Sequence, residues 1–368
     1  MEQYYWAALA ALLGYQAPQK MKYFLSHFGT AKQALQASPQ ELAHQGLLTA
    51  GQARNWDSQM REDLPERLYT YCETHGVTIL TLLDDSYPEL LRHIADPPPV
   101  LYVKGTLTDT SGALAIVGSR KATPYGLGNA EHFAAKLAGR GISIISGGAY
   151  GIDAAAHTGA LKAHGTTVAV LGGGFEHLYP SDHVRLFDKI CSQGALITEF
   201  TPWTESLALH FPLRNRIIVG LSKGVLVVEA AVKSGAMITA HLAADENRDV
   251  YAIPGPISSP VSKGTHKLIQ EGARLVTTPE QVAALLQGQL TGQEPEEDGA
   301  SLFPPDPVKT DPLQEELYQW LSRQGQSHSL ESIAEHFPQS LAQLNMAALE
   351  LELAGKIRKG PADRYYVV

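Results

Sequence analysis

The chain has 368 residues, 44 % of them apolar and 18 % charged, with a formal net charge of -9, a composition that excludes an intrinsically disordered protein. At roughly 150 residues per domain the length predicts two or three domains, and because no apolar run approaches the roughly 18 residues of a membrane span, we expect a cytoplasmic protein without a membrane partner. Cys72 and Cys191 are too few and too far apart for a disulfide framework or a cysteine-rich zinc site, so neither a metal nor another cofactor is expected.

Residues 1–62 are predicted to form a small helical domain. Apolar segments at 5–13, 21–28, 31–37, 39–45 and 50–56 are separated by turn residues, and Ser38-Pro39 is a strong helix start. A helix at 64–74 and strands at 77–82 and 100–103 come next. We expect this segment to extend the domain that follows it.

Residues 113–286 alternate apolar, mostly β-branched strands with amphipathic helices. The predicted strands are 113–117, 142–146, 167–171, 195–199, 225–229, 249–253 and 274–276. Continuous apolar runs indicate strands that are buried on both faces, which is typical of a parallel sheet with helices on each side. The predicted fold is therefore α/β, a doubly wound, mainly parallel, Rossmann-like domain that extends over residues 63–286.

The remainder of the chain predicts a linker and a third domain. Residues 287–312 are rich in proline, glycine and acidic side chains and have no hydrophobic period. Helical spacing follows at 313–324, 330–336 and 340–354, and strands at 356–358 and 364–368 flank a turn. Three helices and a hairpin predict a winged helix over residues 313–368.

Glycine-rich loops follow three of the predicted strands, where ligands of open α/β sheets bind. The loops are Gly118-Ser119-Arg120, Gly147-Gly148-Ala149 and Gly172-Gly173-Gly174. Residues 113–274 carry 15 Lys and Arg against 12 Asp and Glu, so this is the basic part of an acidic chain. Glycine loops, helix N-termini and an arginine together predict a phosphate site, although any single loop is equally explained by a tight turn.

A second cationic cluster is Arg214-Asn215-Arg216. It is either a set of further phosphate contacts, which Lys267 would extend, or a structural arginine pair that holds carboxylates, and the two hypotheses carry equal weight.

Familiar catalytic and nucleotide-binding patterns are absent or misplaced. Neither GxGxxG nor GxxxxGK[ST] occurs, and the GxSxG match at 220–224 precedes a strand instead of following one. His157 and His164 are interpreted as packing or surface histidines. The strand-end carboxylates Asp153, Glu199 and Glu229 are interpreted mainly as caps or arginine partners.

These loops together resemble the DNA-processing protein A family, also called Smf. The match is carried by VGSRKATPYG (117–126), SGGAYGIDAAAH (146–157), GGG with YP downstream (172–180), FPLRNRIIVGLS (211–222), VVEAAVKSGAMITA (227–240), AIPGP (252–256) and KGTHKLIQEGA (263–273). The flanking domains also fit the three-part layout of the family, whose N-terminal helical domain is of the SAM or helix-hairpin-helix kind.

The resemblance implies a protein without catalytic activity that binds single-stranded DNA in the Rossmann-like domain, forms a homodimer through that domain, and loads the RecA recombinase during natural transformation. Arg120 would be the principal phosphate ligand. The backbone at Ser119, Gly148 and Ala149 would surround the phosphate, with Asn215 and Arg216 beside it.

The sequence departs from the family pattern at two places. Ser181 stands where relatives usually carry a lysine, so that contact is lost or passes to Arg185. The expected recognition helix, 340–354, carries Glu350 and Glu352 and no Lys or Arg, which argues against recognition of duplex DNA by this domain.

The alternative function is a nucleotide-processing hydrolase of the phosphoribohydrolase type, whose PGGxGTxxE motif this chain lacks.

Overall fold

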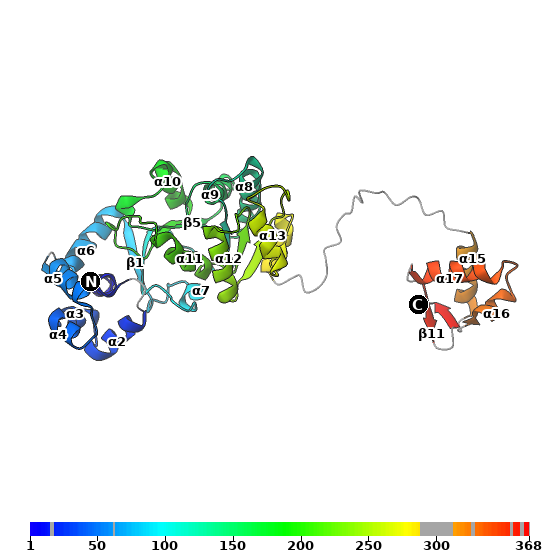
Figure 1. Ribbon diagram of the computed structural model, residues 1–368, viewed down its shortest axis with the longest axis horizontal. Helices are drawn as coiled ribbons and strands as arrows, with labels where there is room; N and C mark the ends of the chain where they lie inside the picture. The colour runs from blue at the N-terminus through cyan, green and yellow to red at the C-terminus, as the bar shows by residue number, and fades with distance from the viewer. Residues whose placement is uncertain are drawn as a thin grey trace. The chain divides into compact units, whose positions relative to one another are not determined.

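The computed structural model describes residues 1–14, 18–61, 63–287, 312–324, 328–353, 356–360 and 364–367. The chain forms two compact units, Met1–Gln293 and Glu294–Val368 (Figure 1). The predicted linker, 287–312, falls almost entirely on residues 288–311, which lie outside the described residues.

A nine-stranded sheet forms the centre of the first unit, in the order β1-β2-β6-β5-β4-β3-β7-β8-β9. Its strands are β1 (Val77–Thr81), β2 (Val100–Gly105), β3 (Leu114–Val117), β4 (Ile144–Ser146), β5 (Thr167–Val170), β6 (Ala195–Thr198), β7 (Gly224–Val227), β8 (Asp249–Ala252) and β9 (Arg274–Leu275). From β3 to β9 all neighbours pair in parallel, whereas β2 pairs antiparallel with both β1 and β6. The mainly parallel, doubly wound prediction is confirmed, and the chain order reverses between β3 and β7.

Helices cover both faces of this sheet, as the apolar strands require. One face packs against α8 (Pro124–Ala138), α9 (Ile152–Lys162), α10 (Val184–Gln193) and α14 (Pro279–Leu286). The other packs against α7 (Glu89–Arg92), α11 (His210–Gly220), α12 (Gly235–Asp245) and α13 (Lys263–Gln270). Alternate residues of one strand enter different cores: Ile116 packs with Phe133 of α8, and Val117 with Ile218 of α11.

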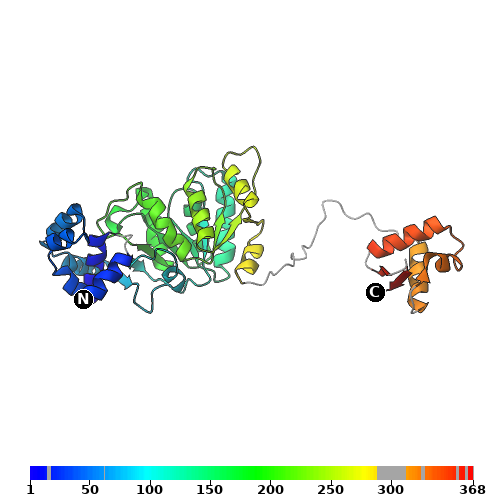
Figure 2. The same ribbon diagram turned by 60° about the horizontal axis from the view of Figure 1, so that its bottom comes forward.

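Among the described residues, six helices precede the first strand, and Figures 1 and 2 show them at the β1 end of the sheet. They are α1 (Glu2–Leu13), α2 (Pro18–Phe28), α3 (Ala31–Leu35), α4 (Pro39–His44), α5 (Ala50–Arg61) and α6 (Leu64–His75). The expected helix start is confirmed, because Pro39 opens α4 and the Ser38 side chain accepts a hydrogen bond from the Glu41 backbone N–H at 3.3 Å. The buried side chains of these helices form one cluster with Tyr102 of β2 and Phe187 of α10.

The second unit contains the helices α15 (Pro312–Gln324), α16 (Leu330–Ala334) and α17 (Leu341–Leu353). Strands β10 (His328–Ser329), β11 (Ile357–Gly360) and β12 (Arg364–Val367) form an antiparallel sheet in the order β10-β12-β11. Strand β10 was not predicted from the sequence. The unit has a core of its own around Leu317, Leu344 and Ile357. The assignment of this unit as a winged helix stays a prediction. So does the assignment of residues 1–62 to the SAM or helix-hairpin-helix kind of domain.

Within the described residues, no helix combines the length and the apolar character that crossing a membrane requires.

Candidate nucleic-acid interface

A cavity of about 880 Å³ opens at the carboxyl ends of the parallel strands. Residues that follow β3, β4, β5, β6, β7 and β8 all line it, among them Ser119, Ala149, Tyr179, Ser234 and Val261. It includes the point between β3 and β7 where the chain order reverses, and at such a point the loops diverge and leave room for a ligand. The sequence prediction of a site at the strand ends thus agrees with the position of the cavity.

Arg120 is the exposed cation of this cavity. It follows β3 in a short turn in which the Ser119 hydroxyl accepts a hydrogen bond from the Lys121 backbone N–H at 3.1 Å. The Arg120 guanidinium carbon lies 5.0 Å from the centre of the Phe211 ring, a cation–π distance. Arg120 forms none of the ion pairs found among the described residues, and it lines the cavity.

A second guanidinium, that of Arg214, forms part of the cavity wall. Arg214 is 3 % exposed and donates hydrogen bonds to the carbonyls of Gly147, at 2.7 Å, and Val170. Burial, together with the charge of Arg120, lowers the pKa of Arg214 to about 10, against the opposing effect of Asp153. The wall of the cavity therefore combines the buried cation of Arg214 with the exposed one of Arg120.

Asp153 is the buried carboxylate beside these two arginines. It accepts hydrogen bonds from the backbone N–H groups of Gly147 at 3.2 Å and Ala149 at 3.4 Å. Burial raises the pKa of Asp153, although Arg214 and those two N–H groups oppose the shift. Asp153 thus holds the second glycine loop in place, and the Ala149 N–H, expected to face a phosphate, is already hydrogen-bonded to this carboxylate.

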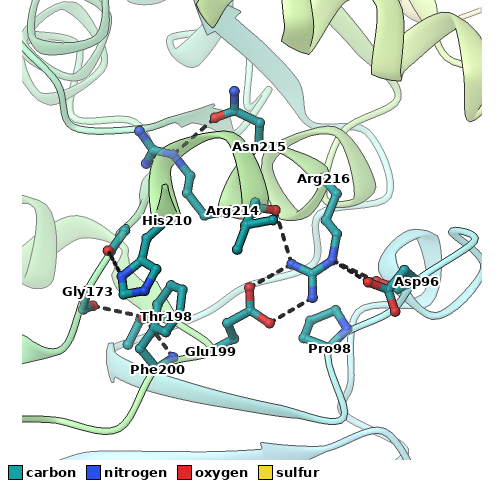
Figure 3. Close-up of polar contacts among 12 residues, drawn as sticks. Asp96, Pro98, Gly173, Thr198, Glu199, Phe200, His210, Arg214, Asn215 and Arg216 are labelled. Atoms are coloured by element: carbon teal, nitrogen blue, oxygen red, sulfur yellow. Dashed lines mark hydrogen bonds and ion pairs between the residues drawn. The ribbon is translucent and has the colours of Figure 1, made fainter. Parts of the chain in front are cut away.

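Helix α11 separates the two arginines that the sequence placed in one cluster. Phe211, Arg214, Asn215 and Ile218 line the cavity, and their spacing of three and four residues is that of one helical face. Arg216 leaves α11 on another side (Figure 3). The helical period of this segment could therefore have indicated from the sequence that Arg214 and Asn215 face the cavity and that Arg216 does not.

The Arg216 side chain forms a buried ion-pair network. Its two terminal nitrogens each lie 2.7 Å from an oxygen of Glu199, and its Nε lies 3.2 Å from Asp96 Oδ2. Glu199 is 3 % exposed and burial raises its pKa, against the lowering by Arg216. Of the two hypotheses for the arginine cluster, this geometry is that of the structural arginine holding carboxylates.

The remaining strand-end carboxylate, Glu229, fixes the first loop. It accepts hydrogen bonds from the Thr123 hydroxyl at 2.6 Å and the Thr123 backbone N–H at 2.9 Å. Thr123 in turn caps α8 by accepting from the Gly126 N–H, and a side chain at Gly126 would clash with the Glu229 carboxyl. All three strand-end carboxylates therefore act in the capping and pairing roles that the sequence analysis favoured.

Four of the eight residues predicted to bind DNA line the cavity, namely Ser119, Arg120, Ala149 and Asn215. Four do not: Gly148, Arg185, Arg216 and Lys267. Gly148 adopts a positive φ of 67° and its carbonyl lies 3.0 Å from His183 Nδ1. Arg185 is exposed in the first turn of α10, and Lys267 of α13 forms an exposed ion pair with Glu271 at 3.5 Å.

The third glycine loop packs against its neighbours instead of lining the cavity. A side chain at Gly174 would overlap the backbone carbonyls of Thr201 and Pro202, and one at Gly173 would overlap Ser206.

The interpretation of His157 and His164 as packing or surface histidines is also consistent with the structure. His157 is buried in α9 with its Nδ1 2.7 Å from the Thr167 hydroxyl, and His164 lies beyond the end of that helix.

Two aromatic residues that were not predicted from the sequence lie in the site. Phe211 and Tyr179 both line the cavity, and their ring centres lie 5.5 Å apart. Tyr150 is 38 % exposed, whereas Phe175 is buried, at 7 % exposed. An aromatic residue at each of several strand-end loops was the available signal.

This arrangement defines an open α/β domain with an arginine-lined cavity at its switch point, the place where ligands of this class of fold bind. A family model described as DNA recombination-mediator protein A matches residues 78–287. The chain belongs to this family. Protein Smf from Escherichia coli is 40 % identical over 317 residues, covering 85 % of this chain and 83 % of the relative. DNA processing protein DprA from Bacillus subtilis is 39 % identical over 237 residues, covering 64 % and 80 %.

Two solved structures extend the similarity to the fold. DNA processing protein A from Streptococcus pneumoniae matches with a TM-score of 0.67 and 34 % identity, over 77 % of this chain and 98 % of that one. DNA processing protein A from Helicobacter pylori matches with a TM-score of 0.52 and 27 % identity, over 58 % and 96 %, and its description reports a single-stranded DNA binding mode.

Proposed function

We propose that this protein binds single-stranded DNA in the switch-point cavity, without strong sequence preference, and loads the RecA recombinase onto that strand during natural transformation and recombination. The observation that carries the proposal is Arg120, an exposed residue after β3 that lines the cavity and forms no ion pair among the described residues. Phosphate is the ligand chemistry that a guanidinium fork beside a helix N-terminus favours.

The contact set follows from the positions of the predicted residues. Arg120 binds a phosphate, with Ser119 and Asn215 beside it and the buried charge of Arg214 behind it. Arg185 and Lys267, which are exposed outside the cavity, contact the strand as it leaves. We leave Arg216 out of the set, because its ion pairs with Glu199 and Asp96 already occupy it.

Single-stranded DNA is favoured over a free nucleotide by the relatives of this chain. Backbone contacts position a strand without reading its bases, so little sequence preference is expected. The matching Helicobacter pylori protein is described as binding single-stranded DNA, and other relatives are described as DNA processing proteins.

Assembly and RecA loading rest on the family alone. We propose a homodimer formed through residues 63–286, so that two strand-binding cavities act in one particle. The acidic second unit, with Glu350 and Glu352 on α17, serves protein contact or regulation instead of duplex binding. RecA is the proposed protein partner, in a cytoplasmic setting.

The function is tested by isothermal titration of the full chain with a single-stranded oligonucleotide, its duplex, nucleoside monophosphates and NAD. We expect tight binding of the single strand only. Binding of a nucleoside monophosphate with release of its base would instead support the hydrolase alternative, against which stand the structural hydrogen bonds of Asp153, Glu199 and Glu229.

A further inference from the structure

Three aromatic rings from three separate segments of the chain lie in and beside the cavity. Tyr150 follows β4, Tyr179 follows β5 and Phe211 belongs to the first turn of α11, and we refer to them as the aromatic row. The Tyr150 and Tyr179 ring centres are 6.4 Å apart, and those of Tyr179 and Phe211 are 5.5 Å apart. Tyr150 and Tyr179 are 38 % and 42 % exposed.

The aromatic row begins at the arginine that the proposed function assigns to phosphate. The Arg120 guanidinium lies 5.0 Å from the Phe211 ring centre, and Tyr179 lines the same cavity. From Arg120 the row therefore leads past Phe211 and Tyr179 to Tyr150. A strand whose phosphate is held by Arg120 has its neighbouring nucleotides within the same surface.

We propose that the aromatic row stacks successive bases of the single strand that Arg120 anchors. This inference rests on the proposed function and adds to it the class of group that is recognised beyond the phosphate. Adjacent rings of the row are steeply inclined, at 80° and 61°, so each ring meets its own base instead of extending one continuous stack. Every base has a π-face, so the contacts add affinity without adding sequence preference.

A purely structural role is the competing interpretation. The Tyr150 hydroxyl donates a hydrogen bond to Asp182 at 3.1 Å, and its ring contacts that of His183 at 4.9 Å. In that interpretation the hydroxyl of Tyr150 is the important group, because it joins the loops after β4 and β5. In the base-stacking interpretation the ring is the important group, and the two differ in what Tyr150→Phe does.

The test compares two probes on the full chain: an oligo(dT) of about 15 nucleotides, and an abasic oligonucleotide of the same length and charge. Wild type is expected to bind oligo(dT) more tightly. Tyr150→Ala and Tyr179→Ala should each weaken oligo(dT) binding by about fivefold or more and leave abasic binding unchanged, because stacking on one ring is lost. Tyr150→Phe and Tyr179→Phe should bind both probes as wild type does.

A matched control is Tyr23→Ala, which removes a tyrosine ring that is 45 % exposed in α2. It should change neither affinity. Because both probes are titrated into the same preparation, a partly unfolded variant lowers both affinities together and leaves their ratio unaffected.

The outcomes separate the two proposals. If wild type binds neither probe, the proposed function fails. If wild type binds both probes equally and the alanine variants do the same, the aromatic row is overturned while the phosphate site stands. If Tyr150→Phe loses as much oligo(dT) affinity as Tyr150→Ala, the hydroxyl bond to Asp182 explains the effect and base stacking is again overturned.

Discussion

Replacing Arg216 by alanine decides between the two roles that the sequence allowed for this arginine. In the structure it holds Glu199, a carboxylate that is 3 % exposed, through two hydrogen bonds of 2.7 Å, and it also pairs with Asp96. Removing one partner of a buried pair leaves a buried charge without compensation, which costs about 3–5 kcal/mol. For a unit of this size that corresponds to a melting temperature roughly 6–20 °C lower.

The loss should depend on pH in a defined direction. Burial raises the pKa of Glu199, and Arg216 opposes that rise, so removing the arginine raises the pKa further. A group whose folded pKa lies above its unfolded value contributes stability at low pH and loses that contribution as the pH rises through the folded pKa. The difference between Arg216→Ala and wild type should therefore be smallest near pH 5 and grow toward pH 8.

The assay is thermal unfolding at several pH values, followed by titration with a single-stranded oligonucleotide well below the melting temperature. A second variant, Arg216→Met with Glu199→Leu, removes both charges and should recover most of the stability. The folded fraction of each variant should bind the oligonucleotide as wild type does. A normally stable Arg216→Ala protein with tenfold weaker binding would refute the structural role and restore Arg216 as a phosphate ligand.

Arg120→Ala should leave the melting temperature unchanged but weaken single-strand binding by roughly ten- to a hundredfold. The slope of log K against log salt should fall by about 0.7, because one phosphate contact is lost. Unchanged affinity in a folded variant would remove Arg120 from the site. A chain that ends at residue 293 should bind single strands within about tenfold of the full chain, since the second unit has its own core and an acidic α17; a larger loss would show that its strands contact DNA. The same shortened chain should scatter light as a dimer at tens of micromolar, and a strict monomer at that concentration would contradict the proposed assembly.

The sequence by itself determined the architecture of the central domain. The parallel strands from β3 to β7 are buried on both faces, so they appear as continuous apolar runs. Each predicted run between residues 113 and 276 corresponds to a strand from β3 to β9, although β8 is partly exposed and β9 is exposed. The position of the cavity was determined in the same way, because parallel strands bring all their carboxyl ends to one edge, and the glycine loop with Arg120 follows the first of them.

Only the tertiary structure decided which side chains meet there. Arg214 and Arg216 are the same residue type and lie two positions apart, yet α11 directs Arg214 to the cavity and Arg216 to Glu199 and Asp96. The antiparallel pairing of β2 with β6 could not be predicted either, because the local sequence of a strand does not determine which strand it pairs with. The aromatic row depends on contacts between loops that are far apart in the chain, and such contacts are set by packing, which local sequence patterns do not encode.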